Sequence, residues 1–209
     1  MDRTLLYFAD PMCSWCWGFA PVMEKICAKS QGQAELVVML GGLRPFTDHA
    51  MTDKDKAYVR NHWEHVAEAS GQPFDFGFFE RPDFTYDTEP ACRAVVAARR
   101  LGPSFAYPML NRLHRAFYAE GQDTSDPDTL ADLAAETGMQ RSDFQAEFEN
   151  EDTKQETLAD FHYAQRSQIS GFPTLVGIAE GQTPAALTIG FRPWKDMEPA
   201  IAQWLSAQE

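Results

Sequence analysis

Short, dense runs of apolar residues lie near both ends of the chain, whereas apolar residues recur at helical spacing between them. Residues 4–9 are aliphatic, aromatic and prone to β structure, which predicts a buried strand that ends at an Asp-Pro dipeptide. Residues 13–29 predict a helix, and Pro21 is expected to kink it because the proline ring clashes with the preceding turn. Residues 35–40 predict a second strand. A right-handed crossover would make the two strands parallel neighbours.

Residues 43–171 form a long middle section that we expect to be mostly helical. Its first helix begins at a capping box of Thr52 and Asp55. Further helices are expected over 90–101, 110–117, 127–138 and 142–168, the last with a break near Asn150. Ser142 and Gln145 match a capping box at the start of that last segment.

The end of the chain returns to strands, predicted over 173–179 and 186–191, and closes with an amphipathic helix from Trp194. No repeat or linker separates the helical section from the two ends, which favours one compact α/β unit. We therefore expect a small αβ domain made of residues 1–42 and 172–209, with residues 43–171 as a helical insertion that closes over it.

Composition removes several classes of function. The 209 residues include 31 acidic and 18 basic ones, a net charge of −13, which argues against a nucleic-acid partner. The densest apolar run, residues 36–43, is too short to span a bilayer, and the N-terminus lacks the features of a secretory signal. We expect a cytoplasmic protein without a membrane partner. Nothing in the sequence indicates its oligomeric state.

Two of the four cysteines stand at a strand-to-helix junction, in the sequence Cys13-Ser14-Trp15-Cys16. The free N–H groups and the dipole of the helix favour a thiolate at Cys13. Cys16 lies one turn further on and can attack a mixed disulfide formed at Cys13. This arrangement suits thiol–disulfide exchange, with an exposed attacking thiol and a sheltered resolving thiol. Trp15 is expected to be exposed and to contact the substrate.

A half zinc site and a structural disulfide are the alternative interpretations of this pair. Structural zinc needs four ligands, yet Cys27 and Cys92 are isolated, and the helix-spaced pair His62 and His65 is far away in the sequence. A structural disulfide is uncommon in a chain that is not secreted. We therefore expect no metal site, and we expect Cys27 and Cys92 to be inert. The five histidines show no spacing that demands catalysis.

Two further features, Pro173 with its neighbour Phe172 and a phenylalanine-rich segment, each allow two interpretations. Pro173 is either an ordinary strand-entry proline or a cis proline facing the cysteine pair. In the second case the backbone of Phe172 is free to pair with an extended peptide, and its ring shapes what docks beside Cys13. The five phenylalanines within residues 74–84 either line a groove for unfolded polypeptide or attach the insertion to the αβ domain.

Taken in order, these motifs resemble the DsbA-like branch of the thioredoxin superfamily, an α/β thioredoxin-like fold with a large all-helical insertion. The motifs are Asp10-Pro11, then Cys13-Ser14-Trp15-Cys16-Trp17-Gly18-Phe19, and Gly171-Phe172-Pro173-Thr174. Pro21 stands where thioredoxin-like proteins also kink the active-site helix. Within the branch, the chain is most similar to cytoplasmic members described as FrnE-like or provisionally as disulfide isomerases.

The resemblance implies a thiol–disulfide oxidoreductase with Cys13 as nucleophile, Cys16 as resolving thiol and Pro173 as cis-proline. The expected substrate-contacting residues are Ser14, Trp15, Phe172 and Pro173. Protein or peptide thiols and disulfides are the implied partners, with glutathione as a candidate redox partner and no bound cofactor or metal. The direction of the reaction stays open, although reduction or isomerisation fits a cytoplasm better than net oxidation.

The chain departs from the family pattern at two places. Its Ser14-Trp15 dipeptide differs from the dipeptides of DsbA and thioredoxin, so no redox potential can be carried over. It also has Tyr7 where DsbA-like proteins can place a buried glutamate. Asp10 is the nearest acid, and it either relays protons to Cys16 or, as we favour, caps the helix.

Two alternatives to the oxidoreductase remain. The same branch contains kappa-class glutathione transferases and 2-hydroxychromene-2-carboxylate isomerases, which use a serine where redox members use cysteine, and Ser14 is available here. A resolving cysteine has no use in such an enzyme, and this argues against it. The other alternative is a non-catalytic thioredoxin-like module that binds peptides and has vestigial cysteines.

Overall fold

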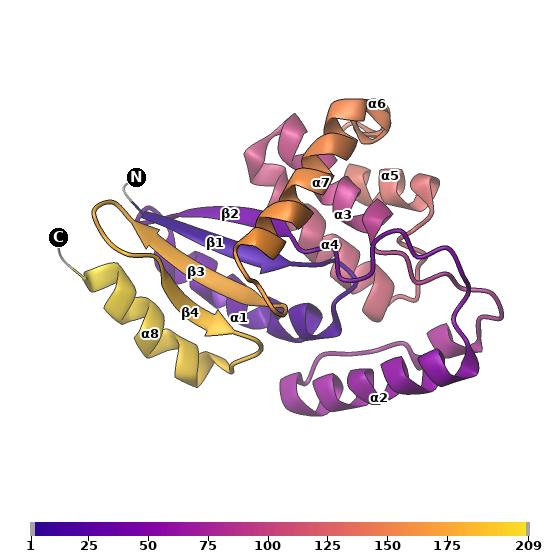
Figure 1. Ribbon diagram of the computed structural model, residues 1–209, viewed down its shortest axis with the longest axis horizontal. Helices are drawn as coiled ribbons and strands as arrows, with labels where there is room; N and C mark the ends of the chain where they lie inside the picture. The colour runs from indigo at the N-terminus through magenta and orange to yellow at the C-terminus, as the bar shows by residue number, and fades with distance from the viewer. Residues whose placement is uncertain (1–2, 208–209) are drawn as a thin grey trace.

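A four-stranded sheet forms the centre of the computed structural model, which describes residues 3–207 (Figure 1). Its strands are β1 (Arg3–Ala9), β2 (Glu35–Leu40), β3 (Thr174–Ala179) and β4 (Ala185–Ile189), in the order β2-β1-β3-β4. β1 pairs in parallel with β2, as predicted, whereas the β1–β3 and β3–β4 pairs are antiparallel. The last strand ends two residues earlier than predicted, at Ile189, because Gly190 turns the chain with a φ of 85°.

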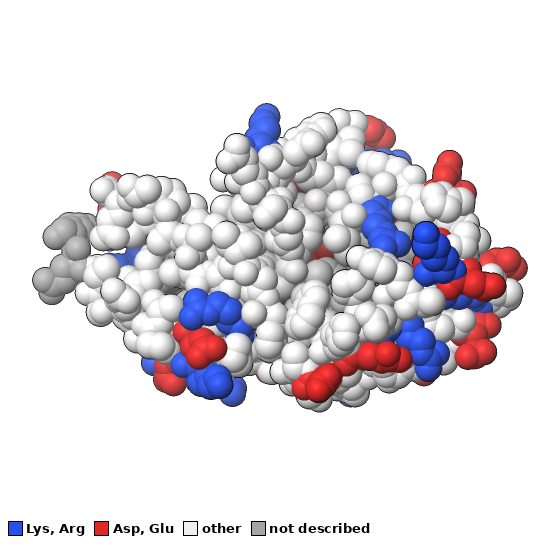
Figure 2. All heavy atoms as spheres, turned by 60° about the horizontal axis from the view of Figure 1, so that its bottom comes forward, with Lys and Arg blue, Asp and Glu red and all other residues white. Residues whose placement is uncertain are grey.

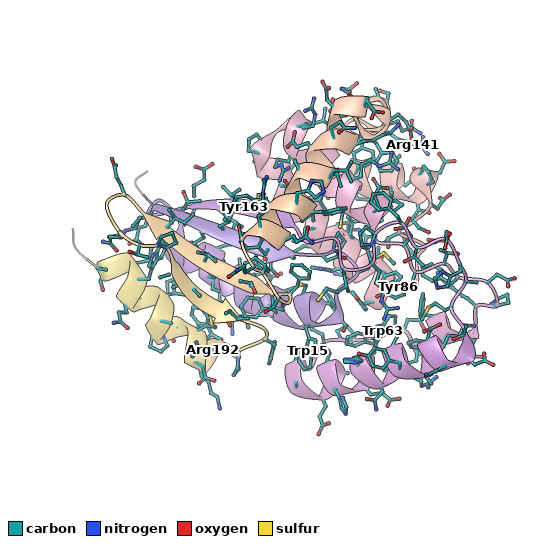
Figure 3. The ribbon with its side chains drawn as sticks, viewed as in Figure 1. Trp15, Trp63, Tyr86, Arg141, Tyr163 and Arg192 are labelled. Atoms are coloured by element: carbon teal, nitrogen blue, oxygen red, sulfur yellow. The ribbon has the colours of Figure 1, made fainter. Side chains whose placement is uncertain are left out.

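β1 is the best-protected strand because helices cover both faces of the sheet. Leu5 and Tyr7 point into the main core with α1 (Ser14–Ser30) and α8 (Trp194–Ser206). Leu6 and Phe8 point to the opposite face, where Tyr163 of α7 (Glu151–Arg166), labelled in Figure 3, stacks on Phe8 at 6.0 Å between ring centroids. A strand buried on both faces needs the continuous apolar run that the sequence has here.

Helices fill the chain between β2 and β3. They are α2 (Asp53–Ser70), the 3₁₀ turn η1 (Phe76–Glu80), α3 (Glu89–Leu101), the 3₁₀ turn η2 (Pro103–Phe105), α4 (Ala106–Tyr118), α5 (Pro127–Glu136), α6 (Arg141–Glu149) and α7 (Glu151–Arg166). In Figure 1, α2 lies along the bottom of the view, apart from the other helices of this section. No helix within residues 3–207 is long and apolar enough to cross a bilayer.

The sequence patterns that predict helix ends are confirmed at Thr52 and near Asn150, and are wrong at Ser142. Thr52 and Asp55 form the predicted capping box of α2. The capping box predicted at Ser142 is absent, because α6 already begins at Arg141 after an extended Gln140. The Arg141 side chain is bound by two aspartates of α5, at 2.7 and 2.8 Å, and this contact fixes the start of α6. The expected break near Asn150 is confirmed, since this residue caps α7.

An ionic contact fastens the helical section to the β2 edge of the sheet. The buried Asp160 of α7 accepts the backbone N–H of Leu40 at 3.0 Å and a two-pronged contact from Arg99 of α3 at 2.9 and 3.0 Å. Arg99 also donates to the carbonyl of Val38 at 2.9 Å. The N–H of Leu40 and the carbonyl of Val38 on this edge are thereby satisfied without a further strand.

A separate aromatic cluster holds α2 in place. Trp63 is fully buried and contacts six other rings, of which Phe79 and Tyr118 are nearest at 4.8 and 5.0 Å between centroids. Phe78, Phe79 and Phe84 are buried in this cluster, with Met12 and Trp17 from the αβ part of the molecule. The phenylalanine-rich segment therefore attaches the insertion to the rest of the protein, the second of its two interpretations.

Candidate active site

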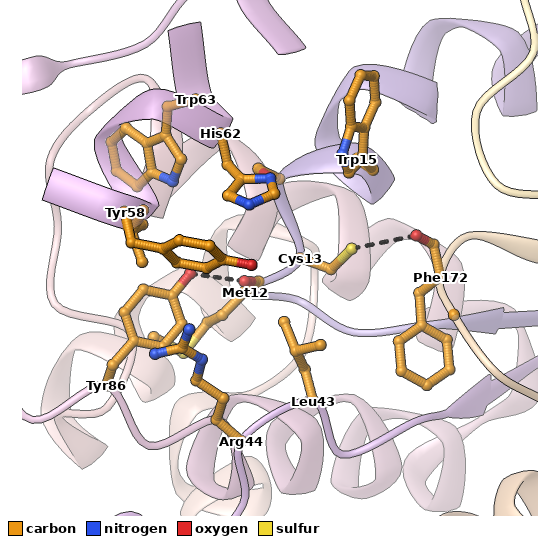
Figure 4. Close-up of a pocket in the computed structure, with 13 residues that line it drawn as sticks. Met12, Cys13, Trp15, Leu43, Arg44, Tyr58, His62, Trp63, Tyr86 and Phe172 are labelled. Atoms are coloured by element: carbon orange, nitrogen blue, oxygen red, sulfur yellow. Dashed lines mark hydrogen bonds between the residues drawn. The ribbon is translucent and has the colours of Figure 1, made fainter. Parts of the chain in front are cut away.

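Cys13, the first cysteine of the pair, borders a pocket of about 280 Å³ between the αβ part of the molecule and α2 (Figure 4). One side, here called the thiol wall, consists of Met12, Cys13, Ser14, Trp15, Gly171 and Phe172. The other side, the insertion wall, consists of Leu43, Arg44, Tyr58, Val59, His62, Trp63 and Tyr86. Trp15 and Trp63 lie on its two sides (Figure 4).

Cys13 lies in the thiol wall at the start of α1. It is the N-cap of α1, and its carbonyl accepts the N–H groups of Cys16 and Trp17 at 3.0 and 3.1 Å. Its thiol donates to the carbonyl of Phe172 over 3.6 Å. The expected exposed thiol is a wrong prediction, because only 5% of Cys13 is exposed. Phe172 and the loop before α1 enclose it, and the pocket is its route to solvent.

Cys16 lies behind Cys13, one helical turn into the core. It has no exposed surface, and both thiols are free in this structure. Burial raises the pKa of the Cys16 thiol well above its usual value, and the neighbouring Cys13 raises it further. Cys16 therefore holds its proton firmly.

Asp10 does not cap the helix, contrary to our preferred interpretation. Its fully buried carboxylate accepts the N–H of Met12 at 2.9 Å and the N–H of Leu43 at 2.7 Å, and the thiol of Cys92 lies 3.4 Å away. Burial raises the pKa of Asp10, and the two backbone donors act in the opposite direction. Because Met12 and Leu43 belong to opposite walls, Asp10 ties the two walls together at their base.

His114 supports this arrangement from the side away from the pocket, and no sequence pattern predicted that role. Its Nε2 lies 3.1 Å from the carbonyl oxygen of Asp10, which also accepts the N–H of Cys13 at 3.0 Å. Complete burial lowers the pKa of His114 to about 4, so the ring is neutral at pH 7 and Nε2–H is the donor. His114 lies on the buried face of α4. In the sequence, nothing distinguishes this position from that of an ordinary core residue.

The Phe172–Pro173 peptide bond is cis. The Phe172 ring lies against the backbone of Gly41, where an added Cβ would come within 1.9 Å of it. The Phe172 carbonyl, which we expected to be free for a peptide, accepts the Cys13 thiol instead. Pro173 is buried and does not line the pocket, so its expected contact with substrate is not visible. Ser14 and Trp15 line the pocket and are half-buried, with the Trp15 ring 5.6 Å from that of Phe191.

The insertion wall contributes the residues that sequence reasoning missed. Arg44 lies over the ring of Tyr86 at 5.3 Å, and its backbone is paired with Thr88 in both directions. Tyr58 and His62 project from α2, with their ring centroids 4.5 Å apart. Arg44 forms no ion pair with another described residue. Figure 2 shows that charged side chains lie mainly toward the two ends of this face and leave its hollowed centre largely uncharged.

The other candidate ligands and thiols do not gather at this pocket. Residues 3–207 contain no group of three or more His, Cys, Asp or Glu side chains that could hold a metal ion. Of the two helix-spaced histidines, only His62 lines the pocket. Cys27 is half-buried, and burial raises its pKa to about 11, whereas Cys92 is fully buried beside Asp10.

Comparison with known proteins identifies the family to which this chain belongs. Residues 4–202 match the family model described as a DSBA-like thioredoxin domain. The chain belongs to this family. The predicted α/β thioredoxin-like fold with a helical insertion is thereby confirmed, as is the resemblance on which it was based.

Among solved structures of the DSBA-like family, one from Nitrosomonas europaea, provisionally described as a protein disulfide isomerase, is 37% identical, covers 98% of each chain and has a TM-score of 0.90. The cytosolic disulfide reductase DsbM from Pseudomonas aeruginosa is 26% identical over 97% of this chain and 98% of its own, with a TM-score of 0.80. A second structure of DsbM contains GSH.

Curated relatives are more distant. The ClpXP adapter protein SpxH from Halalkalibacterium halodurans is 22% identical over 176 residues, which are 81% of this chain and 56% of that protein. SpxH from Bacillus subtilis is also 22% identical, over 80% of this chain and 56% of its own length. The chain thus spans a little over half the length of the curated relatives it matches.

Proposed function

We propose that the protein is a thiol–disulfide oxidoreductase of the reductase or isomerase type, with Cys13 as nucleophile and Cys16 as resolving thiol. The placement of the two cysteines carries this proposal: Cys13 lines the pocket at the start of α1, and Cys16 is sealed behind it. A disulfide that enters the pocket can therefore meet only the first of the two sulfurs.

In the first step, the Cys13 thiolate attacks one sulfur of a bound disulfide, and the other sulfur departs with the electron pair of the broken S–S bond. The free N–H groups and the dipole at the start of α1 stabilise the attacking anion. Attack forms the Cys13–substrate bond and breaks the substrate disulfide, so no outside oxidant or reductant is needed. The thiol–carbonyl contact with Phe172 must open for the sulfur to approach.

In the second step, Cys16 attacks the Cys13 sulfur and releases the second substrate thiol. The neighbouring Cys13 is part of what raises the pKa of Cys16, and its negative charge disappears once Cys13 has entered a mixed disulfide. Ionisation of the resolving thiol thus becomes easier only after the first step. The products are a Cys13–Cys16 disulfide and two substrate thiols.

Glutathione and peptide disulfides are the substrates that suit the pocket best. Its volume of about 280 Å³ takes a small peptide rather than a folded protein surface. Arg44, without an ion-pair partner in the described part of the chain, offers a charge to a carboxylate next to Cys13. The GSH-containing DsbM structure and the cytosolic location of DsbM support a reducing reaction with glutathione in the cytoplasm.

A binding role is the second candidate, and the SpxH comparison favours it because those relatives are adapters. In that case the two cysteines are dispensable. Replacing both by serine would leave peptide binding intact, whereas an oxidoreductase would lose all turnover.

The direct test compares Cys13→Ser with Cys27→Ser in reduction of insulin disulfides by glutathione. We expect Cys13→Ser to lose at least about 10³-fold in rate, since it removes the nucleophile. Cys27→Ser serves as the control and is expected to act like the unmodified protein. A third variant, Cys16→Ser, is expected to accumulate a glutathione adduct on Cys13. Full activity of Cys13→Ser would refute the proposal.

A further inference from the structure

Disulfide exchange in this pocket places a new negative charge on the departing sulfur. Among the residues that line the pocket, Arg44 is the only Lys, Arg, Asp or Glu side chain. Cys16 cannot supply a proton to that sulfur, because it is sealed behind Cys13. A group on the opposite wall that donated a proton would stabilise the leaving sulfur, and the gain is greatest for a basic aliphatic thiolate.

His62 is placed for this task. It reaches from α2 into the space over Cys13, between Tyr58 and Trp15 (Figure 4). The edge of the Tyr58 ring holds it at 4.5 Å between centroids, and the His62 side chain is half-buried. Neither ring nitrogen has a hydrogen-bond partner among the described residues, in contrast to His114, whose Nε2 is committed to Asp10. Both nitrogens are thus available to a molecule in the pocket.

The other ionisable groups that face this space are unsuited to the task. Arg44, from the loop before α2, keeps its proton at all accessible pH values. Tyr86, from the segment before α3, donates its O–H to the carbonyl of Met12 at 2.7 Å, and burial raises its pKa. Tyr58 is a phenol, a type of group that holds its proton at neutral pH. Imidazole is the one group type here that exchanges protons near pH 7.

We propose that His62 is the general acid of the first exchange step. This inference rests on the proposed function. The Cys13 thiolate attacks the near sulfur of the disulfide, the S–S bond breaks, and the imidazolium of His62 gives its proton to the far sulfur. That sulfur leaves as a neutral thiol, and His62 becomes neutral. In the reverse direction the neutral ring takes the proton from an incoming thiol.

The leaving group itself provides the test. In a Cys16→Ser background, where the reaction stops at the mixed disulfide, Cys13 is reacted with oxidised glutathione and, separately, with dithiobis(nitrobenzoic acid). The aliphatic thiolate of glutathione is the more basic leaving group and gains from a proton donor, whereas the aromatic thiolate is a stable anion and leaves readily without one. His62→Gln is compared with His65→Gln, a control on the same helix that lies outside the pocket. Circular dichroism verifies that both variants are folded.

We expect His62→Gln to slow the reaction with oxidised glutathione by about 10-fold or more, somewhat below the usual range for a general acid because thiolates are tolerable leaving groups. Its reaction with the aromatic disulfide is expected to stay within about 2-fold of the parent. The ratio of parent to variant rates with oxidised glutathione is expected to shrink as the pH rises, because a general acid acts only while it carries its proton.

Equal losses with both disulfides would assign His62 to binding or packing and overturn the proposal. No loss with oxidised glutathione would also overturn it, and the oxidoreductase function would still stand. If the parent reacted with neither disulfide, the proposed function itself would fail. The three outcomes are therefore distinguishable in one set of measurements.

Discussion

The two walls of the pocket are built in different ways. The thiol wall is held by several independent contacts, with Cys13 only 5% exposed and fixed between the start of α1 and the carbonyl of Phe172. The insertion wall combines buried anchors, such as Trp63, with exposed side chains, among them Leu43 at 44% and Tyr58 at 59%. We infer from this difference that the thiol wall determines the exchange chemistry and that the insertion wall determines which disulfides are accepted.

The Trp63→Ala variant tests how the packing of α2 supports the insertion wall. Trp63 is fully buried among aromatic rings, so we expect a loss of about 3–5 kcal/mol in the free energy of unfolding, measured by chemical denaturation. Trp63→Phe keeps most of the packing and is the matched control. If the walls are separate, Cys13 of the alanine variant still reacts with a small disulfide below the unfolding transition. Loss of that reaction in the folded state would contradict the comparison.

The support behind the thiol wall is expected to be sensitive to acid. The pKa of His114 is lowered from 6.5 to about 4 by burial, so the unfolded chain binds a proton that the folded protein resists. Stability conferred by the neutral ring is therefore lost as the pH falls from about 6.5 to 4, by about 3 kcal/mol in total. Asp10, whose pKa is raised, titrates with the opposite sign.

Comparing pH profiles of unfolding free energy for the unmodified protein and His114→Gln isolates the histidine contribution from that of Asp10. The variant is expected to have a flatter profile over this interval. His65→Gln, on an exposed position of α2, is the control and is expected to leave the profile unchanged. Parallel profiles for the unmodified protein and His114→Gln would show that His114 is not held in its neutral form.

The close fit of the thiol wall can be tested at Gly41. A Cβ at this position would come within 1.9 Å of the Phe172 ring, so Gly41→Ala must displace the residue whose carbonyl holds Cys13. We expect a loss of about 1–3 kcal/mol in stability and a changed rate of Cys13 alkylation. Gly171→Ala is the matched control, because an added Cβ there meets nothing within 4 Å. Equal behaviour of the two variants would mean that the wall is not tightly fitted.

The smallest effect is expected on the insertion wall, at Arg44. Arg44→Ala removes a cation that faces the pocket, and we expect about 10-fold weaker binding of glutathione with little change in stability, because only a charged hydrogen bond is lost. Isothermal titration calorimetry at two salt concentrations measures the change. Lys54→Ala removes the same charge from α2 outside the pocket and is the control. A similar loss in both variants would point to a general charge effect.

Sequence patterns predicted the thiol wall well and the insertion wall poorly, and the physical reason is the range of the contacts. Cys13 and Cys16 are placed by one strand, one turn and one helix, all of which have strong local signals. Arg44 and His62 line the same pocket only because α2 packs through its buried aromatic face. The sequence pattern predicts that face, but it does not predict which residues of other segments lie across the pocket from α2.

Failures at Asp10 and Ser142 have the same origin. A local cap was the simplest use for Asp10, yet its carboxylate finds Leu43, which is distant in sequence. At Ser142 the local capping pattern was outweighed by the contacts of Arg141 with α5. In both places tertiary contacts outweighed a local preference worth about 1 kcal/mol.

The redox equilibrium of the cysteine pair tests the central claim most directly. The protein is equilibrated in glutathione buffers of graded potential, its free thiols are alkylated, and the products are identified by peptide mass. We predict a reversible transition between two thiols and one disulfide that joins Cys13 to Cys16, with Cys27 and Cys92 reduced throughout. A stable glutathione adduct without that disulfide would contradict the account and favour a glutathione-dependent isomerase or transferase.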